Sequence, residues 1–136
     1  MYNHILISTD GSELAQRGVD HGLMLAKNLG SKVTVITVTE PYPLNSPATM
    51  ASWSEAQQRH ADDLAKASAS RIGPSFEAVH ASHGSPAEAI VANAAKHACD
   101  LIVMASHGRR GVGRLLVGSQ TAEVVHYSKV PVLVVR

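Results

Sequence analysis

The stretch VMASHGRRGVGRLLVGS, residues 103–119, determines how the rest of this chain is interpreted. It contains the end of an apolar run, Leu101 to Ala105, that is typical of a buried strand, and it stops where a helical pattern begins, near Ser119. Glycines let a backbone approach a ligand closely, and a helix N-terminus presents unpaired N–H groups to an anion. Three arginines lie in the same loop, where they would neutralise phosphates. The stretch therefore predicts a phosphate-binding loop at the carboxyl end of a strand.

Short apolar runs alternate with helical patterns along the whole chain. Predicted strands cover residues 4–8, 33–38, 76–81, 101–105 and 130–135, and predicted helices cover residues 14–29, 52–71, 85–98 and 119–128. This alternation predicts an α/β fold, a single-domain, doubly wound, five-stranded parallel sheet with helices on both faces, which is Rossmann-like. Ligands bind such sheets at the carboxyl ends of the strands. The turn at residues 9–12 and the glycine loop are both expected at that edge.

Bulk properties limit the classes of function. The 136 residues fit one domain, residues 1–136, and a net charge of +1 with 4% aromatic residues argues against nucleic-acid binding. No apolar stretch approaches the length of a membrane span, so no membrane insertion is expected. The single cysteine, Cys99, excludes an internal disulfide, and the opening residues lack the pattern of a signal peptide. We therefore expect a cytoplasmic protein.

Two interpretations apply to the turn after the first strand. The Asp10 carboxylate suits ribose hydroxyls, or a metal ion on a phosphate, whereas the structural alternative is that Asp10 and Ser12 cap the following helix. Further along, Ser85 and Glu88 predict a capping box at the start of a later helix.

The glycine loop also has two interpretations. Gly108 and Gly118 supply backbone N–H groups for a ligand, and Ser119 both caps the last helix and offers its hydroxyl to a phosphate. Alternatively, the loop is a connection in which glycines form turns and arginines favour solvent. It is neither a Walker loop nor the dinucleotide fingerprint, and no catalytic base is identifiable. His80 and His83 lack a third ligand, so no metal site is expected.

With these motifs, the chain resembles the universal stress protein family over essentially its whole length. The matching segments are residues 5–12, 35–40, 84–89, 104–119 and 130–135. The nucleotide-binding branch of that family has the motif Gly-x2-Gly-x9-Gly-[Ser/Thr], and the first glycine is replaced by Ala105 here. The resemblance implies an adenine-nucleotide alpha-hydrolase-like fold that binds ATP, ADP or AMP, with or without Mg²⁺.

Residue roles follow from the resemblance. It implies that Asp10 holds the ribose, that the Val38 backbone faces the adenine, and that His107 lies near the phosphates. The full set of implied nucleotide-binding residues is Thr9, Asp10, Val38, Met104, Ala105, His107, Gly108, Gly118, Ser119, Gln120 and Thr121.

Three functions remain open from the sequence. The first is a stress-response regulatory module whose adenine nucleotide tunes its oligomeric state or its binding to a regulatory protein partner. The second is an enzyme that slowly hydrolyses ATP or transfers its phosphates, and the third is a protein-interaction module without nucleotide. The resemblance also implies a homodimer through the C-terminal strand, Val130 to Val135, whose open edge would otherwise favour aggregation.

Overall fold

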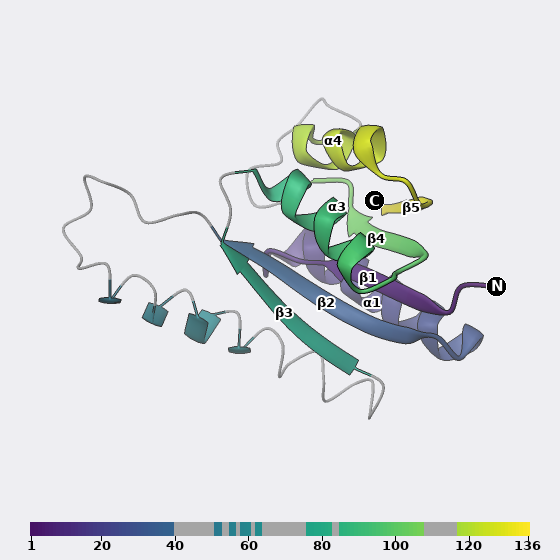
Figure 1. Ribbon diagram of the computed structural model, residues 1–136, viewed down its shortest axis with the longest axis horizontal. Helices are drawn as coiled ribbons and strands as arrows, with labels where there is room; N and C mark the ends of the chain where they lie inside the picture. The colour runs from purple at the N-terminus through teal and green to yellow at the C-terminus, as the bar shows by residue number, and fades with distance from the viewer. Residues whose placement is uncertain are drawn as a thin grey trace.

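The computed structural model describes residues 1–39, 76–82, 85–107 and 117–136, and shorter pieces at residues 51–52, 55–56, 58–60 and 62–63. Its elements follow the expected alternation (Figure 1). They are β1 (His4–Ser8), α1 (Glu13–Leu29), β2 (Lys32–Thr39), β3 (Phe76–Ser82), α3 (Pro86–Lys96), β4 (Leu101–Ala105), α4 (Ser119–Tyr127) and β5 (Val132–Val135).

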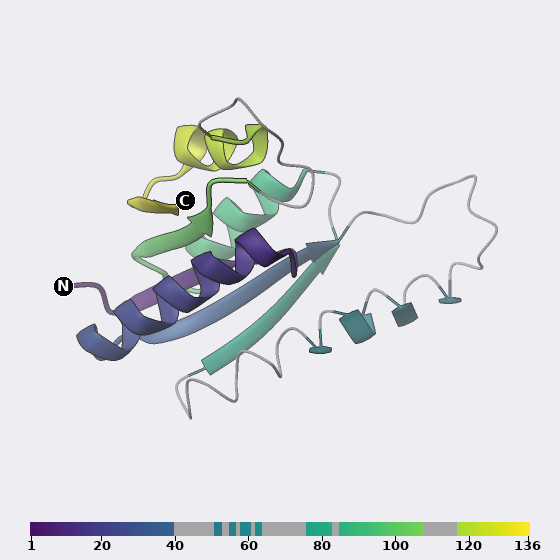
Figure 2. The same ribbon diagram turned by 180° about the vertical axis from the view of Figure 1, so that it is seen from behind.

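The five strands form one sheet in the order β3-β2-β1-β4-β5, and every neighbouring pair is parallel. Helix α1 covers one face, and α3 and α4 cover the other (Figures 1 and 2). Alternate residues of β1 serve the two faces: Ile5 and Ile7 pack under α1, and Leu6 packs on the α3 side. The predicted doubly wound parallel sheet is confirmed.

Local chemistry explains the ends of α1. Ser12 is the N-cap, and its hydroxyl accepts a hydrogen bond from the Ala15 N–H at 3.1 Å. Gly30 ends the helix with a left-handed φ of 67°, a conformation that glycine adopts without strain. Both ends of this helix therefore agree with the sequence pattern.

Two predicted details differ in the structure. The capping box at α3 is wrong, because Ser85 at the N-cap has φ −122° and ψ 100° and its side chain makes no capping bond to the helix. Strand β5 begins at Val132 instead of Val130, since Pro131 has no N–H to join the ladder. Most of the predicted helix at residues 52–71 lies outside the described residues.

The strand order determines where a ligand can reach the sheet. From β1 the chain moves toward β3 on one side, and from β4 it moves toward β5 on the other, so the order reverses between β1 and β4. In open α/β sheets, this reversal opens a crevice at the carboxyl ends of the two strands. The turn after β1 and the glycine loop after β4 both begin at this crevice.

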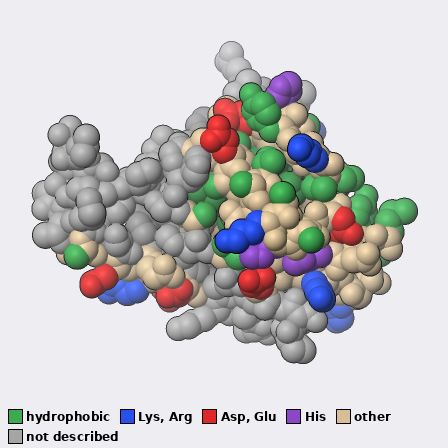
Figure 3. Space-filling view, in the orientation of Figure 1, with side chains coloured by type: hydrophobic (Ala, Val, Ile, Leu, Met, Phe, Trp, Pro, Cys, Tyr) green, Lys and Arg blue, Asp and Glu red, His purple; other side chains and the backbone are tan. Residues whose placement is uncertain are grey.

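The described surface is mixed in character. Figure 3 shows Lys, Arg, Asp and Glu side chains interspersed on the visible face instead of separated by sign. Among the described residues, no helix combines the length and apolar character that crossing a bilayer requires.

Candidate functional site

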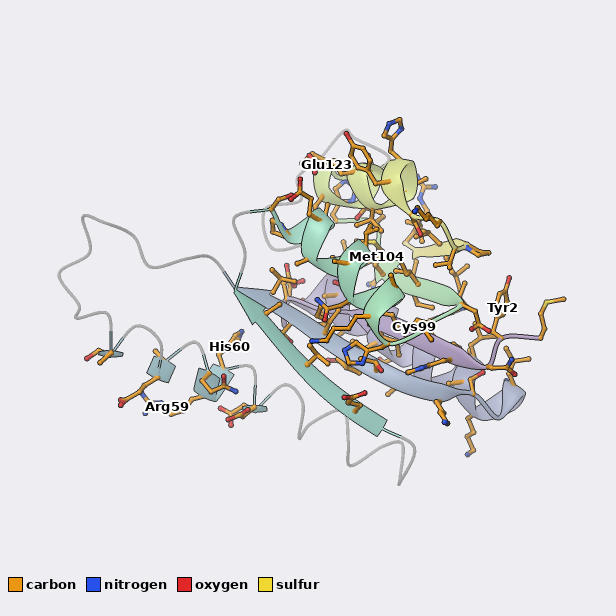
Figure 4. The ribbon with its side chains drawn as sticks, viewed as in Figure 1. Tyr2, Arg59, His60, Cys99, Met104 and Glu123 are labelled. Carbon is orange, nitrogen blue, oxygen red and sulfur yellow. The ribbon has the colours of Figure 1, made fainter. Side chains whose placement is uncertain are left out.

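A pocket opens at the crevice between the ends of β1 and β4. Residues from the ends of three neighbouring strands and from the starts of two helices line it, namely Ser8, Thr9, Asp10, Ala15, Val38, Met104, Ala105, His107, Gln120 and Thr121. Figure 4 places Met104 between α3 and α4, with Tyr2 and Cys99 toward the opposite, amino end of the sheet. All of these lining residues except Ser8 and Ala15 belong to the predicted nucleotide-binding set.

Side chains already satisfy the backbone of the turn after β1. The Gly11 N–H donates to Thr9 Oγ1 at 3.1 Å, and the Ser12 N–H donates to Asp10 Oδ1 at 2.9 Å. With Ser12 capping Ala15, these bonds occupy the Gly11, Ser12 and Ala15 amides around the start of α1. Asp10 therefore shapes the turn before α1, as the structural interpretation expects. It also lines the pocket, as the ligand interpretation expects.

The start of α4 differs from the start of α1. The predicted cap at Ser119 is wrong, because Ser119 is already the first residue of the helix and the N-cap is Gly118, which has no side chain. No side-chain cap is present in the part of the chain that the structure describes. The Gly118 N–H donates to the Ser106 carbonyl at 2.7 Å, and the next turn, with Gln120 and Thr121, borders the pocket. The first amides of α4 are thus placed to bind an anion.

His107 adds a ring nitrogen, Nε2, at this end of the pocket, which donates in the tautomer that carries its proton there. Its Nδ1 lies 3.2 Å from Ser106 Oγ, whereas its Nε2 is buried without a hydrogen-bond partner among the described residues. A buried ring nitrogen without a partner is costly, and an acceptor on a ligand would remove that cost. His107 and the α4 terminus therefore make one end of the pocket suitable for a phosphate.

The Thr121 hydroxyl has a structural bond. It donates to the Ala105 carbonyl at 2.9 Å, and the side chain is 2% exposed, so it anchors the first turn of α4 to the end of β4. A contact from Thr121 to a phosphate would therefore come from its backbone N–H. Gly118 and Ser119 lie beside the pocket at the start of α4 without lining it. Gly108 lies outside the described residues, as do His83 and the side chain of His80.

Sequence reasoning missed Ser8 and Ala15 as pocket residues. Ser8 counted only as the last residue of a strand, and Ala15 only as part of an apolar helix face. The available signal was position, because Ser8 directly precedes the Thr9-Asp10 turn and Ala15 lies in the first turn of the helix that follows.

Other reactive groups lie apart from this pocket. Burial raises the pKa of the Cys99 thiol to about 11, which keeps it protonated and agrees with a packing role. Within the described residues, no cluster of three or more His, Cys, Asp or Glu side chains is arranged to hold a metal ion.

Comparisons with known proteins show the family and the fold. A model of the universal stress protein family matches residues 1–136. A universal stress protein of Thermus aquaticus is 35% identical over 100% of both chains. The solved structure of the universal stress protein UspA from Lactobacillus plantarum superimposes with a TM-score of 0.84, at 27% identity over 99% of this chain and 98% of that one. A universal stress protein solved in complex with cAMP is similar in fold, with a TM-score of 0.74 and 24% identity over 99% of this chain and 97% of that one.

Proposed function

Because the chain belongs to the universal stress protein family, we propose that it is a stress-response regulatory module that binds ATP, ADP or AMP in this pocket. The observation behind the proposal is the start of α4 beside the buried Nε2 of His107, since neither has a side-chain partner among the described residues. Among the described residues neither feature has an acceptor, and the α4 amides, together with Nε2 in the tautomer that carries its proton there, are donors that a phosphate group would satisfy. The cAMP complex of a relative with the same fold supports an adenine nucleotide as the ligand.

The rest of the pocket suits the rest of a nucleotide. Val38 and Met104 offer apolar surface at the ends of β2 and β4, on which a base would lie. Asp10 stands at the end of β1 and would accept hydrogen bonds from ribose hydroxyls. In this arrangement the base, the ribose and the phosphates follow the crevice from β2 toward α4.

Two measurements test the binding proposal. Denaturing the purified protein and identifying any released small molecule by mass spectrometry would show whether a nucleotide is bound after purification. Titration calorimetry with ATP, ADP and AMP, each with and without Mg²⁺, should give dissociation constants in the micromolar range. This range corresponds to a binding free energy of about −8 kcal/mol. No heat and no thermal shift at millimolar nucleotide would contradict the proposal.

The proposal includes a homodimer through β5, the outer strand of the sheet next to β4. The Ile102 and Ser106 N–H groups donate to the carbonyls of Pro131 and Val135, at 3.0 and 2.8 Å. Alternation along the strand then turns the backbone groups of Leu133 toward β4 and those of Val134 toward the open edge. That edge would pair antiparallel with the same edge of a second copy.

Val134→Pro and Leu133→Pro form a matched pair that tests the dimer. Val134→Pro removes an N–H of the open edge, so it should give a monomer by light scattering with a melting temperature near that of the parent. Leu133→Pro removes an N–H that faces β4 and should lower the melting temperature itself. A parent that is monomeric at tens of micromolar, with and without ATP, would rule out the dimer.

Ser106 offers a physical route from the nucleotide to this edge. Its carbonyl accepts from the Gly118 N–H at the start of α4, and its N–H donates to Val135 at the end of β5. A phosphate bound at the start of α4 would therefore be connected to the dimer strand β5 through a single residue, Ser106. We expect ATP to change the dimer dissociation constant, measured by analytical ultracentrifugation, and an unchanged constant would contradict this regulatory role.

A further inference from the structure

The floor of the pocket at its apolar end includes one side chain with a hydroxyl, Ser8. The carboxyl ends of β2, β1 and β4 lie side by side there, because β1 is between the other two strands. Val38 and Met104 pack with the hydrophobic cluster on the α3 side of the sheet. Ser8 is two residues after Leu6, which belongs to the same cluster, so strand alternation places Ser8 on that face as well.

The Ser8 hydroxyl has no partner among the described residues. Ser8 lines the pocket and is half-buried, and its hydroxyl makes no hydrogen bond to the part of the chain that the structure describes. The other polar side chains of the pocket have different positions. Thr9 and Asp10 are in the turn, whereas His107, Gln120 and Thr121 are at the phosphate end. Ser8 is therefore a polar group on an otherwise apolar shelf between Val38 and Met104.

A nucleotide base that rests on this shelf brings polar edge atoms into the pocket. Such atoms lose hydrogen bonds to water and need a partner in the protein. A hydroxyl is suited to this task because it both donates and accepts. A site that hydrogen-bonds one group of its ligand also discriminates against analogues that lack that group.

We infer that Ser8 is a specificity-determining residue whose hydroxyl hydrogen-bonds the polar edge of the bound nucleotide base. This inference rests on the proposed function and adds a residue that reads the base. Two contributions to the affinity for a nucleotide are then separate. Phosphate binding depends on α4 and His107, whereas base recognition depends on Ser8 of β1.

The test compares Ser8→Ala and Ser8→Thr with the parent, using ATP and the base-free anion tripolyphosphate as probes. Ser8→Ala should bind ATP about fivefold more weakly, the usual effect of losing one net hydrogen bond, and tripolyphosphate as tightly as the parent. Ser8→Thr keeps the hydroxyl and should restore most of the ATP affinity. The melting temperature of ligand-free Ser8→Ala should equal that of the parent, because the hydroxyl makes no hydrogen bond within the part of the chain that the structure describes.

Three results would overturn the inference. They are unchanged ATP affinity in Ser8→Ala, an equal loss for ATP and tripolyphosphate, and a Ser8→Thr variant as weak as Ser8→Ala. A parent that binds ATP while Ser8→Ala is unaffected refutes only the role of Ser8. A parent that binds no adenine nucleotide refutes the proposed function together with it.

Discussion

Replacing Gly18 by alanine is expected to disturb both the packing of α1 and the pocket. Gly18 lies where α1 comes close to the end of β4, and a Cβ atom there would be 3.0 Å from the Ala105 nitrogen and 3.3 Å from the Met104 carbonyl carbon. Both atoms are backbone, so rotating a side chain cannot relieve the contact. Either α1 or the end of β4 has to move, and Met104 and Ala105 line the pocket.

Two opposing terms set the expected magnitude. Overpacking a well-packed interior costs about 1–3 kcal/mol, whereas replacing glycine by alanine inside a helix recovers about 1 kcal/mol. We therefore expect Gly18→Ala to lower the free energy of unfolding by about 1 kcal/mol, as measured by urea denaturation. Displacement of Met104 and Ala105 should also weaken ATP binding, measured by calorimetry.

Gly22→Ala is the matched control on the same helix. A Cβ at Gly22 would lie 2.7 Å from Ile7 Cδ1, a side-chain atom in the core away from the pocket lining. This variant should also lose stability, yet it should bind ATP as tightly as the parent. The reasoning fails if the free energy of unfolding of Gly18→Ala exceeds that of the parent by about 1 kcal/mol, the full gain expected from helix propensity. It also fails if both variants lose ATP affinity equally.

Three further predictions concern single buried or paired groups. Thr121→Val leaves the buried Ala105 carbonyl without its donor, so the free energy of unfolding should fall by about 1–3 kcal/mol in urea titrations, whereas Thr121→Ser should stay near the parent. Because burial raises the pKa of the Cys99 thiol to about 11, the unfolded chain loses its thiol proton first as pH rises. Stability should therefore fall between about pH 9 and 11 in the parent and less steeply in Cys99→Ser; equal slopes would contradict this origin. The Asn3 and His4 N–H groups donate to the Asp100 carboxylate at 2.8 and 3.0 Å and lower its pKa. The ionised carboxylate therefore stabilises the fold above its ordinary pKa, and this stabilisation is lost as acid protonates it. Asp100→Asn should therefore reduce the fall in the free energy of unfolding at acidic pH. An unchanged fall would show that other carboxylates cause it.

The sequence predicts what depends on local pattern. A buried strand such as β4 is recognised as a continuous apolar run. Helix α1 is recognised because its apolar residues recur at three- and four-residue steps and end at Gly30. The glycine loop also predicts a phosphate site at the start of α4, but the pattern assigns the helix cap to Ser119, whereas the N-cap is Gly118. That the Ser85 side chain does not cap α3 cannot be read from the sequence, since capping depends on the backbone torsions that Ser85 adopts in the folded chain.

By itself, the sequence determined that this chain is a doubly wound α/β domain with its candidate site after the first and fourth strands. Hydrophobic period and turn residues act over a few positions, so they can be read without knowing which strands are neighbours. Only the tertiary structure decided that Val38, Ser8 and Met104 form one surface and that the Thr121 hydroxyl is committed to Ala105. These contacts join residues far apart along the chain, and they exist because the order of the strands places β1 between β2 and β4.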